Sequence, residues 1–242
     1  MTGPRVYFRI PILGGIPITE TIVNMWILMA LITLLCIWLT RRMQKVPKGR
    51  QAIAELLVCK LYKLVADTMG EKNLKFAPYI GTLFTMSIVG SLSSLVGMRP
   101  ITADLSVTLG WSLVTFTMVQ VVAIRSKGAK GWLKSFAKPV PFLLPLNIVS
   151  EIANPISMSF RHFGNIAAGM VITSLVYGAL ASLSSLLLRL IPNAFLSAIP
   201  ILQLGIPAFL SIYFDLFSSF LQAYIICMLT MVFVASAAEP EA

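Results

Sequence analysis

Four ionisable side chains lie inside two long apolar stretches of the sequence: Glu151, Arg161, His162 and Asp215. A charge at the centre of a lipid bilayer costs about 2.5–3.5 kcal/mol on insertion scales, so each of these side chains requires a compensating role. An ion or substrate pathway is one such role, and a polar contact between helices is the alternative. Arg161 lies too far from either end of its stretch for its side chain to reach the membrane surface easily.

Helical spacing places small and polar residues around Arg161. An α-helix brings positions 154, 157, 161, 165 and 168 to one face. These positions are Asn154, Ser157, Arg161, Asn165 and Ala168. In the second stretch a similar face carries Ser211, Asp215, Ser218 and Gln222. The two faces predict a fixed cation on one helix and a carboxylate and an amide on its partner.

The composition requires a membrane around these residues. Of the 242 residues, 57% are hydrophobic and 12% are charged, whereas a soluble domain carries roughly 25% charged residues. The three cysteines, Cys36, Cys59 and Cys227, are far apart and lack the spacing of a disulfide framework or a zinc site. A soluble enzyme, a disordered tail and a secreted disulfide scaffold are therefore excluded, and neither a metal nor a cofactor is expected.

We expect a single all-α integral membrane domain with about five crossings and one amphipathic surface helix. The expected order is an external segment 1–18, a span 19–40, a cytoplasmic basic and amphipathic segment 41–78, a span 79–97, an external turn 98–104, a span 105–124, a cytoplasmic basic loop 125–138, a long helix 139–190, an external hairpin turn 191–197, a long helix 198–236 and a cytoplasmic tail 237–242. The two apolar stretches 146–190 and 200–236 would be about 67 and 55 Å long as helices. Each must therefore tilt, kink at Pro155 or Pro207, or divide into two pieces.

The distribution of positive charge predicts the orientation. Segment 41–78 holds nine of the 19 Lys and Arg residues and loop 125–138 holds five. Because cytoplasmic loops are enriched in Lys and Arg, the N-terminus is expected outside and the C-terminus in the cytoplasm. The net charge of +10 then reflects membrane orientation, and no nucleic-acid partner is expected.

Three motifs resemble subunit a of the F-type ATP synthases. Residues 155–169 read PISMSFRHFGNIAAG and are similar to the family signature Pro-x-Ser-Leu-x-x-Arg-Leu-Phe-Gly-Asn-x-x-Ala-Gly. Residues 99–105, RPITADL, resemble the family motif that opens its third span, and residues 221–224, LQAY, resemble a motif near its end. The resemblance covers roughly residues 80–236.

The resemblance implies a stator subunit in a bacterial inner membrane, with the c-subunit ring, the b-subunit peripheral stalk and the other ATP synthase subunits as partners. Arg161 matches the essential arginine that faces the ring, and Asn165 and Gln222 match polar positions near it. Such a subunit supplies two offset half-channels for ions, with protons favoured. His162 stands in place of the usual Leu, and we expect it as a further candidate for lining the ion path.

One further departure concerns the outer half-channel. Met170 stands where many relatives carry a carboxylate, and Asp215 stands where many carry a histidine. If the two long helices are antiparallel with Arg161 and Gln222 at one depth, residues 170 and 215 reach a similar level from opposite helices. We expect Asp215, with Ser211, Ser218 and Gln222, to line the outer half-channel. Glu151, Asn147 and Asn154 are expected to line the inner one.

Two other functions are weighed against this interpretation. A small secondary transporter could use Arg161 and Asp215 to bind an anionic solute, although no inverted repeat is found. A non-conducting assembly subunit could pair Arg161 with an acidic residue of a partner. The chain has no Gly-x-x-x-x-Gly-Lys-Ser/Thr motif, so no nucleotide binding and no enzymatic activity of the isolated chain are expected. The choice between H+ and Na+, the size of the ring and the direction of operation stay open, because the ion-binding carboxylate belongs to the ring.

Overall fold

The computed structural model describes residues 5–11, 16–41, 43–138, 140–188, 210 and 212–238. Two short strands, β1 (Val6–Ile10) and β2 (Ile16–Thr19), form an antiparallel pair ahead of the first helix. The main-chain N–H of Glu20 donates to the carbonyl of Arg5 at 2.8 Å, which ties this pair to the helix start. The strands were not predicted from the sequence.

Most of the rest of the described chain is helical. Its longer helices are α1 (Glu20–Thr40), α2 (Arg50–Met69), α3 (Ala77–Leu92), α4 (Leu105–Ser135), α5 (Leu144–Leu188) and α8 (Ser218–Ala238). Short 3-10 turns lie at Glu71–Phe76, Ser93–Val96, Ile101–Ala103 and Pro141–Leu143, and a π-helical turn, Ile212–Phe217, leads into α8. Within the described residues five helical segments are long and apolar enough to cross a membrane. The predicted all-α membrane fold with five crossings is confirmed.

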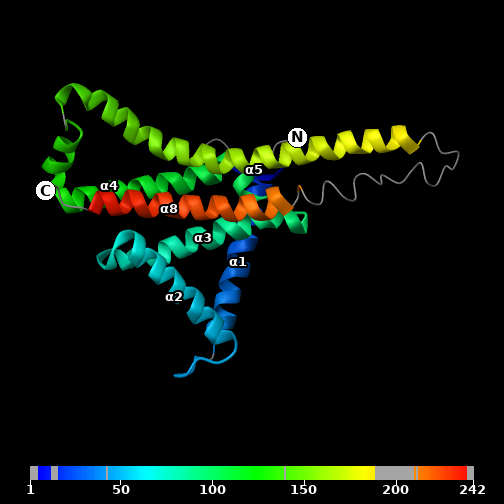
Figure 1. Cartoon of the computed structure of the whole chain (residues 1–242), viewed down its shortest axis with the longest axis horizontal. Coiled ribbons are helices and arrows are strands. Elements are labelled where there is room, and N and C mark those ends of the chain that lie inside the picture. Colours follow the sequence, from blue (N-terminus) through cyan, green and yellow to red (C-terminus); the bar gives the residue numbers. More distant parts are fainter. Residues whose placement is uncertain are drawn as a thin grey trace.

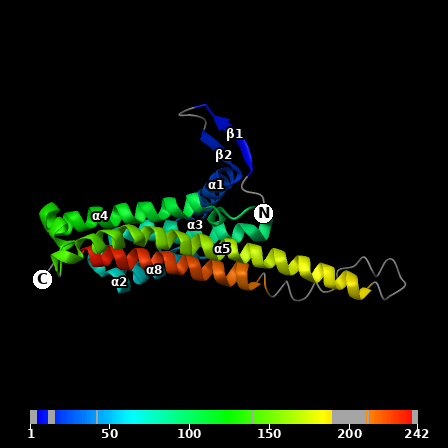
Figure 2. The same ribbon diagram turned by 90° about the horizontal axis from the view of Figure 1, so that it is seen from above.

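Helix α5 is one continuous helix despite an internal proline. Its 45 residues include Pro155 and span about 67 Å, so the chain does not divide there. Helices α5 and α8 lie side by side and run in opposite directions, and α5 continues beyond the start of α8 (Figures 1 and 2). The expected turn 191–197, Pro207 and the tail at residues 239–242 lie outside the described residues.

Helix α4 is longer than the expected span 105–124. The Asp104 side chain caps its start by accepting a hydrogen bond from the main-chain N–H of Ser106 at 3.0 Å. The helix then continues to Ser135 through a bend at Gly128, where φ is 73° and ψ is 159°. Positive φ favours glycine, since a side chain would crowd the backbone there. The basic residues expected in a loop are therefore carried largely on the helical end of α4.

Helix α8 is central to the packing. Its buried residues recur every three or four positions, as in Ala223, Ile226, Thr230 and Val234. They pack with buried apolar side chains of α2, α3 and α5. Helix α1 diverges from this group (Figure 1) and buries only Thr21, Asn24 and Leu28. Most of the apolar surface of α1 therefore faces outward, as expected for a helix in contact with lipid or a partner chain.

Pairs of hydroxyl groups join the helices inside the fold. The oxygens lie 2.9 Å apart in the Ser91–Thr102 pair, 3.2 Å in the Thr108–Ser159 pair and 3.4 Å in the Thr115–Thr230 pair. In a membrane such bonds contribute about 0.6 kcal/mol each on average. The small side chains also allow the helices to approach closely.

The close approach of α3 to the turn Ile101–Ala103 can be tested at Gly90. A Cβ atom at Gly90 would overlap the fully buried side chain of Ile101. We expect Gly90→Ala to lower the stability of the subunit by about 1–3 kcal/mol through overpacking. The measurement is the temperature at which the subunit unfolds in the purified complex.

Gly110 in α4 is the matched control, because a Cβ atom there would meet nothing within 4 Å. Gly110→Ala should leave the unfolding temperature unchanged or raise it, since alanine favours helix by about 1 kcal/mol over glycine. Equal effects of the two substitutions would contradict the packing described here.

Candidate ion-pathway site

Arg161 lies on the outer face of α5. The five residues of its helical face, Asn154, Ser157, Arg161, Asn165 and Ala168, are all exposed. Arg161 is 17 positions beyond Leu144, the first residue of α5, which corresponds to about 25 Å along the helix. None of the residues that the structure describes forms an ion pair or a hydrogen bond with its guanidinium. Its charge is therefore available to a group outside the subunit.

His162 points the opposite way, into the bundle. Its side chain is 1% exposed, and its Nε2 lies 3.2 Å from the hydroxyl oxygen of Ser87 on α3. Its ring also lies against Trp111 of α4, with 6.0 Å between ring centroids. The Nδ1 atom has no hydrogen-bond partner among the described residues. His162 is thus an interior contact between helices and not a residue of the exposed Arg161 face.

Asp215 lies in the π-helical turn before α8, half-buried. The turn and α5 are close here: a Cβ atom on Gly169 would lie 3.1 Å from Phe214. A small cavity of about 10 Å³ opens at this level, which is about the space for one water molecule. Its lining includes Asp215, Met170 and the hydroxyl residues Ser91, Ser94 and Ser219. The hydroxyl of Ser94 donates to the main-chain carbonyl of Ser91 at 3.1 Å, so Ser94 shares the lining with Asp215.

This cavity bears on the depth expected for residues 170 and 215. Met170 and Asp215 line one cavity from opposite helical segments, and the main chain of Gln222 lies beside the ring of His162. The antiparallel alignment of Arg161 with Gln222, assumed from the sequence, agrees with both contacts. Residues 170 and 215 therefore do reach a similar level.

The expected face of Ser211, Asp215, Ser218 and Gln222 does not form one surface. Ser211 lies outside the described residues, Ser218 is half-buried, and Gln222 is 3% exposed. Ser219, not Ser218, lines the small cavity with Asp215. The physical reason is the π-helical turn, which takes more residues per turn than an α-helix and so rotates the start of α8 about its axis. Nothing in the sequence indicated Ser91, Ser94 or Ser219.

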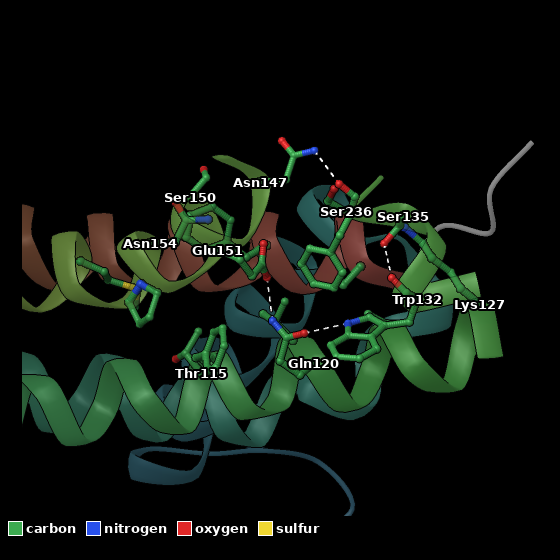
Figure 3. A pocket seen from close by; sticks show the side chains of 18 of the residues that line it. Thr115, Gln120, Lys127, Trp132, Ser135, Asn147, Ser150, Glu151, Asn154 and Ser236 are labelled. Carbon is green, nitrogen blue, oxygen red and sulfur yellow. Dashed lines mark hydrogen bonds between the residues drawn. The ribbon is translucent and has the colours of Figure 1, made fainter. Parts of the chain in front are cut away.

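A larger cavity of about 450 Å³ lies between α4, the first part of α5 and the end of α8. Three residues expected to share a pathway, Asn147, Glu151 and Asn154, all line it (Figure 3). The amide nitrogen of Asn147 donates to the carbonyls of Phe136 and Lys138 at 2.9 and 3.0 Å. The lining of this cavity includes the basic residues Lys127 and Lys138.

Two residues of α4, Gln120 and Trp132, form a chain of hydrogen bonds that ends at Glu151 (Figure 3). Neither was predicted from the sequence. The Nε2 of Gln120 donates to the Glu151 carboxylate at 2.6 Å, and the Nε1 of Trp132 donates to the Oε1 of Gln120 at 2.9 Å. Gln120 is a polar residue within the apolar span 105–124, and this was the one feature of the sequence that could have identified it as a site residue. Trp132 lies beyond the bend at Gly128, and no pattern in the sequence connects it with Gln120.

Along α5 the order is large cavity, Arg161, small cavity. The α5 residues of the large cavity are Asn147, Ser150, Glu151, Asn154, Pro155 and Met158, and those of the small cavity are Ile166, Gly169 and Met170. A guanidinium between two polar cavities can hold an anion between them and repel cations. Among the described residues no group of three His, Cys, Asp or Glu side chains is placed to hold a metal ion.

Comparison with known proteins identifies the family. The sequence model of the ATP synthase A chain family matches residues 22–235. ATP synthase subunit a of Moorella thermoacetica is 33% identical over 225 residues, which cover 93% of each chain. ATP synthase subunit a 2 of a Bradyrhizobium species is 33% identical over 226 residues, covering 93% of this chain and 91% of its own.

A third relative is described as sodium ion specific. It is ATP synthase subunit a of Propionigenium modestum, 30% identical over 264 residues, covering 96% of this chain and 84% of its own. The family match extends over nearly all the described helices, from α1 to α8. The chain is therefore a multi-pass membrane protein that belongs to the family of ATP synthase subunit a, a non-catalytic membrane subunit of the F-type ATP synthases.

Proposed function

We propose that this subunit conducts ions between two offset half-channels and that Arg161 separates them, facing a ring of c subunits. The observation that carries the proposal is the exposed guanidinium of Arg161, unpaired within the described chain, between two polar cavities of α5. A continuous pore would dissipate the ion gradient, so the two paths must end at the ring. Carboxylates of the ring would carry ions from one path to the other.

The charge of Arg161 would act on each ring carboxylate as it passes. At about 4 Å and an effective dielectric constant of 20, a guanidinium stabilises a carboxylate by roughly 4 kcal/mol. This is enough to keep the passing carboxylate ionised, so an ion must leave before Arg161 and another must bind after it. Membrane potential supplies about 2.3 kcal/mol per charge per 100 mV. Arginine suits the role better than lysine because it stays protonated when poorly solvated.

The large cavity is proposed as the inner half-channel. It lies at the basic end of α4, beside Lys127, and the positive-inside rule assigns this end to the cytoplasm. Glu151, Asn147 and Asn154 would line the path that leads toward Arg161. With the same orientation, the N-terminus lies outside and the C-terminus lies in the cytoplasm of a bacterial inner membrane.

The small cavity is proposed as part of the outer half-channel, with Asp215 as its carboxylate. Asp215 lines the cavity from the segment opposite Met170, together with the hydroxyl residues Ser91, Ser94 and Ser219. A carboxylate in this place could exchange ions between outside water and the ring. Asp215 would take the place of the carboxylate that many relatives carry at the position of Met170.

The partners would take different surfaces. We propose that the c ring packs against the exposed face of α5 that carries Arg161 and Asn165. The b-subunit stalk would contact another part of the subunit, for which the exposed apolar surface of α1 is available. Nucleotide chemistry would stay on the partner chains of the complex.

The role of Arg161 is tested by Arg161→Ala. We expect ATP synthesis driven by an ion gradient, and ATP-driven pumping, to be abolished in membrane vesicles that carry the assembled complex, because ring carboxylates lose their counter-charge. Arg161→Lys should retain little activity. The matched control is Arg125→Ala, which removes an exposed arginine of α4 and should leave coupling intact. Coupled synthesis in the Arg161→Ala complex would refute the proposal.

The proposal that Asp215 supplies the carboxylate of the outer half-channel is tested by Asp215→Asn. We expect ion-driven ATP synthesis to fall at least tenfold, because the amide cannot exchange an ion with the outer path. Asp67→Asn, which neutralises an exposed carboxylate of α2, is the control and should have no effect. Adding Met170→Glu to Asp215→Asn should restore part of the rate, since residues 170 and 215 line one cavity. Unchanged synthesis in Asp215→Asn would show that Asp215 is not part of the path.

Protons are the ion we propose, and sodium is the second candidate. The small cavity has space for about one water molecule, which suits proton transfer between hydroxyl groups, whereas sodium needs several oxygen ligands. The sodium-specific relative from Propionigenium modestum supports the second candidate. With proton coupling, the rate of ATP hydrolysis by the intact complex should not depend on added Na+ at neutral pH. Strong stimulation by millimolar Na+ would identify a sodium-driven complex.

A further inference from the structure

We infer that Trp132 and Gln120 are positioning residues that fix the carboxylate of Glu151 in the lining of the large cavity. The inference rests on the proposed function, because it assigns this carboxylate to the inner half-channel. It adds two residues to that path and a reason for the bend of α4. The hydrogen bonds run from Trp132 to Gln120 on α4 and from Gln120 across to Glu151 on α5 (Figure 3).

The direction of the hydrogen bonds is fixed from the tryptophan end. An indole N–H can only donate, so Gln120 must turn its Oε1 toward Trp132, at 2.9 Å. The Nε2 of the same amide then faces Glu151 and can only donate, at 2.6 Å. Glu151 therefore accepts this hydrogen bond through its Oε1, and its carboxylate is held in one place in the cavity lining.

Gly128 brings the tryptophan back to Gln120. In a straight α-helix, residues 12 positions apart lie about 18 Å apart along the axis, too far for side chains to meet. At Gly128 the backbone leaves the helical region, with φ 73° and ψ 159°. The chain turns there, so the Trp132 indole reaches Gln120. The bend in α4 therefore serves a contact in the cavity.

The charge balance of the cavity explains why a fixed anion would matter. The ionisable side chains of the described lining are Lys127 and Lys138 on the side of α4, and Glu151 on α5. From α8 the lining receives Phe233, Ser236 and Ala237, none of which ionises. A mouth flanked by lysines repels cations, and a carboxylate inside it offsets that repulsion. Loss of the Glu151 charge should slow the passage of cations between the cytoplasm and the ring.

The test compares Trp132→Phe with Trp26→Phe in vesicles that carry the assembled complex. Both variants remove an indole N–H and keep a ring, but Trp26 is exposed on α1. We expect Trp132→Phe to lower ATP-driven pumping roughly two- to tenfold at neutral pH, the range that one lost hydrogen bond explains. Trp132→Phe leaves the amide of Gln120 free to turn away, so the Glu151 carboxylate is no longer held in place. Equal pumping rates of the two variants would overturn the inference.

The background variant Glu151→Gln separates an effect through Glu151 from a general structural effect. In Glu151→Gln, adding Trp132→Phe or Gln120→Leu should not change the pumping rate further. A further loss in this background would mean that Trp132 acts by another route, and the inference would be wrong. Normal pumping by Glu151→Gln alone would also overturn it, while leaving the role of Arg161 intact.

A spectroscopic measurement tests the hydrogen bonds without any transport. Ultraviolet resonance Raman spectra report the hydrogen bonding of indole N–H groups, and the wild type minus Gln120→Leu difference should show one tryptophan losing its acceptor. Trp132→Phe should remove that difference. Absence of the difference would refute the contact itself. If Arg161→Ala retained coupling while the Raman difference was present, the proposed function would fail and the contact would stand.

Discussion

The rotation of α5 about its own axis is the constraint on which the rest of the site depends. Consecutive helical residues point about 100° apart, so a helix that buries His162 must turn Arg161 outward. The buried face of α5 is held by Ser87 and Trp111 around His162, and by the Thr108–Ser159 hydroxyl pair. These neutral polar contacts fix the place of a charge that they do not touch. The guanidinium of Arg161 therefore lies on the exposed face of α5 and has no ion-pair partner among the described residues.

The packing of α5 differs between its two ends. Near its first residues, polar side chains of α5 line a large cavity that α4 and α8 share. Toward Gly169 it approaches the π-helical turn so closely that only a small cavity is left. Met158, the residue of the large cavity that is nearest Arg161 in sequence, also packs in the apolar core. In the proposed function the two cavities belong to separate half-channels, and an ion passes from one to the other through the ring.

The sequence predicted the features that depend on hydrophobic length and helical period. Apolar runs identified the five spanning segments, and a spacing of three to four residues placed Asn154, Arg161 and Asn165 on one exposed face. The prediction from sequence failed where the backbone departs locally from an α-helix, because the spacing of residues on one face then changes. The π-helical turn exchanges Ser218 for Ser219 beside Asp215, and the bend at Gly128 joins Trp132 to Gln120. The strand pair β1–β2 was missed because its strands are short and their pairing is not a local property.

An unpaired guanidinium in an apolar span makes this subunit incomplete on its own. A charge at mid-bilayer costs about 2.5–3.5 kcal/mol on insertion scales, and none of the described residues offsets that of Arg161 through an ion pair or a hydrogen bond. A permanent partner inside the subunit would remove the cost, but it would also remove the attraction for a carboxylate of another chain. The small residues Gly164 and Ala168 beside Arg161 leave room for such a chain to approach. In the proposed function, the same exposed face would favour assembly with the ring and would leave the arginine free to exchange one ring carboxylate for the next.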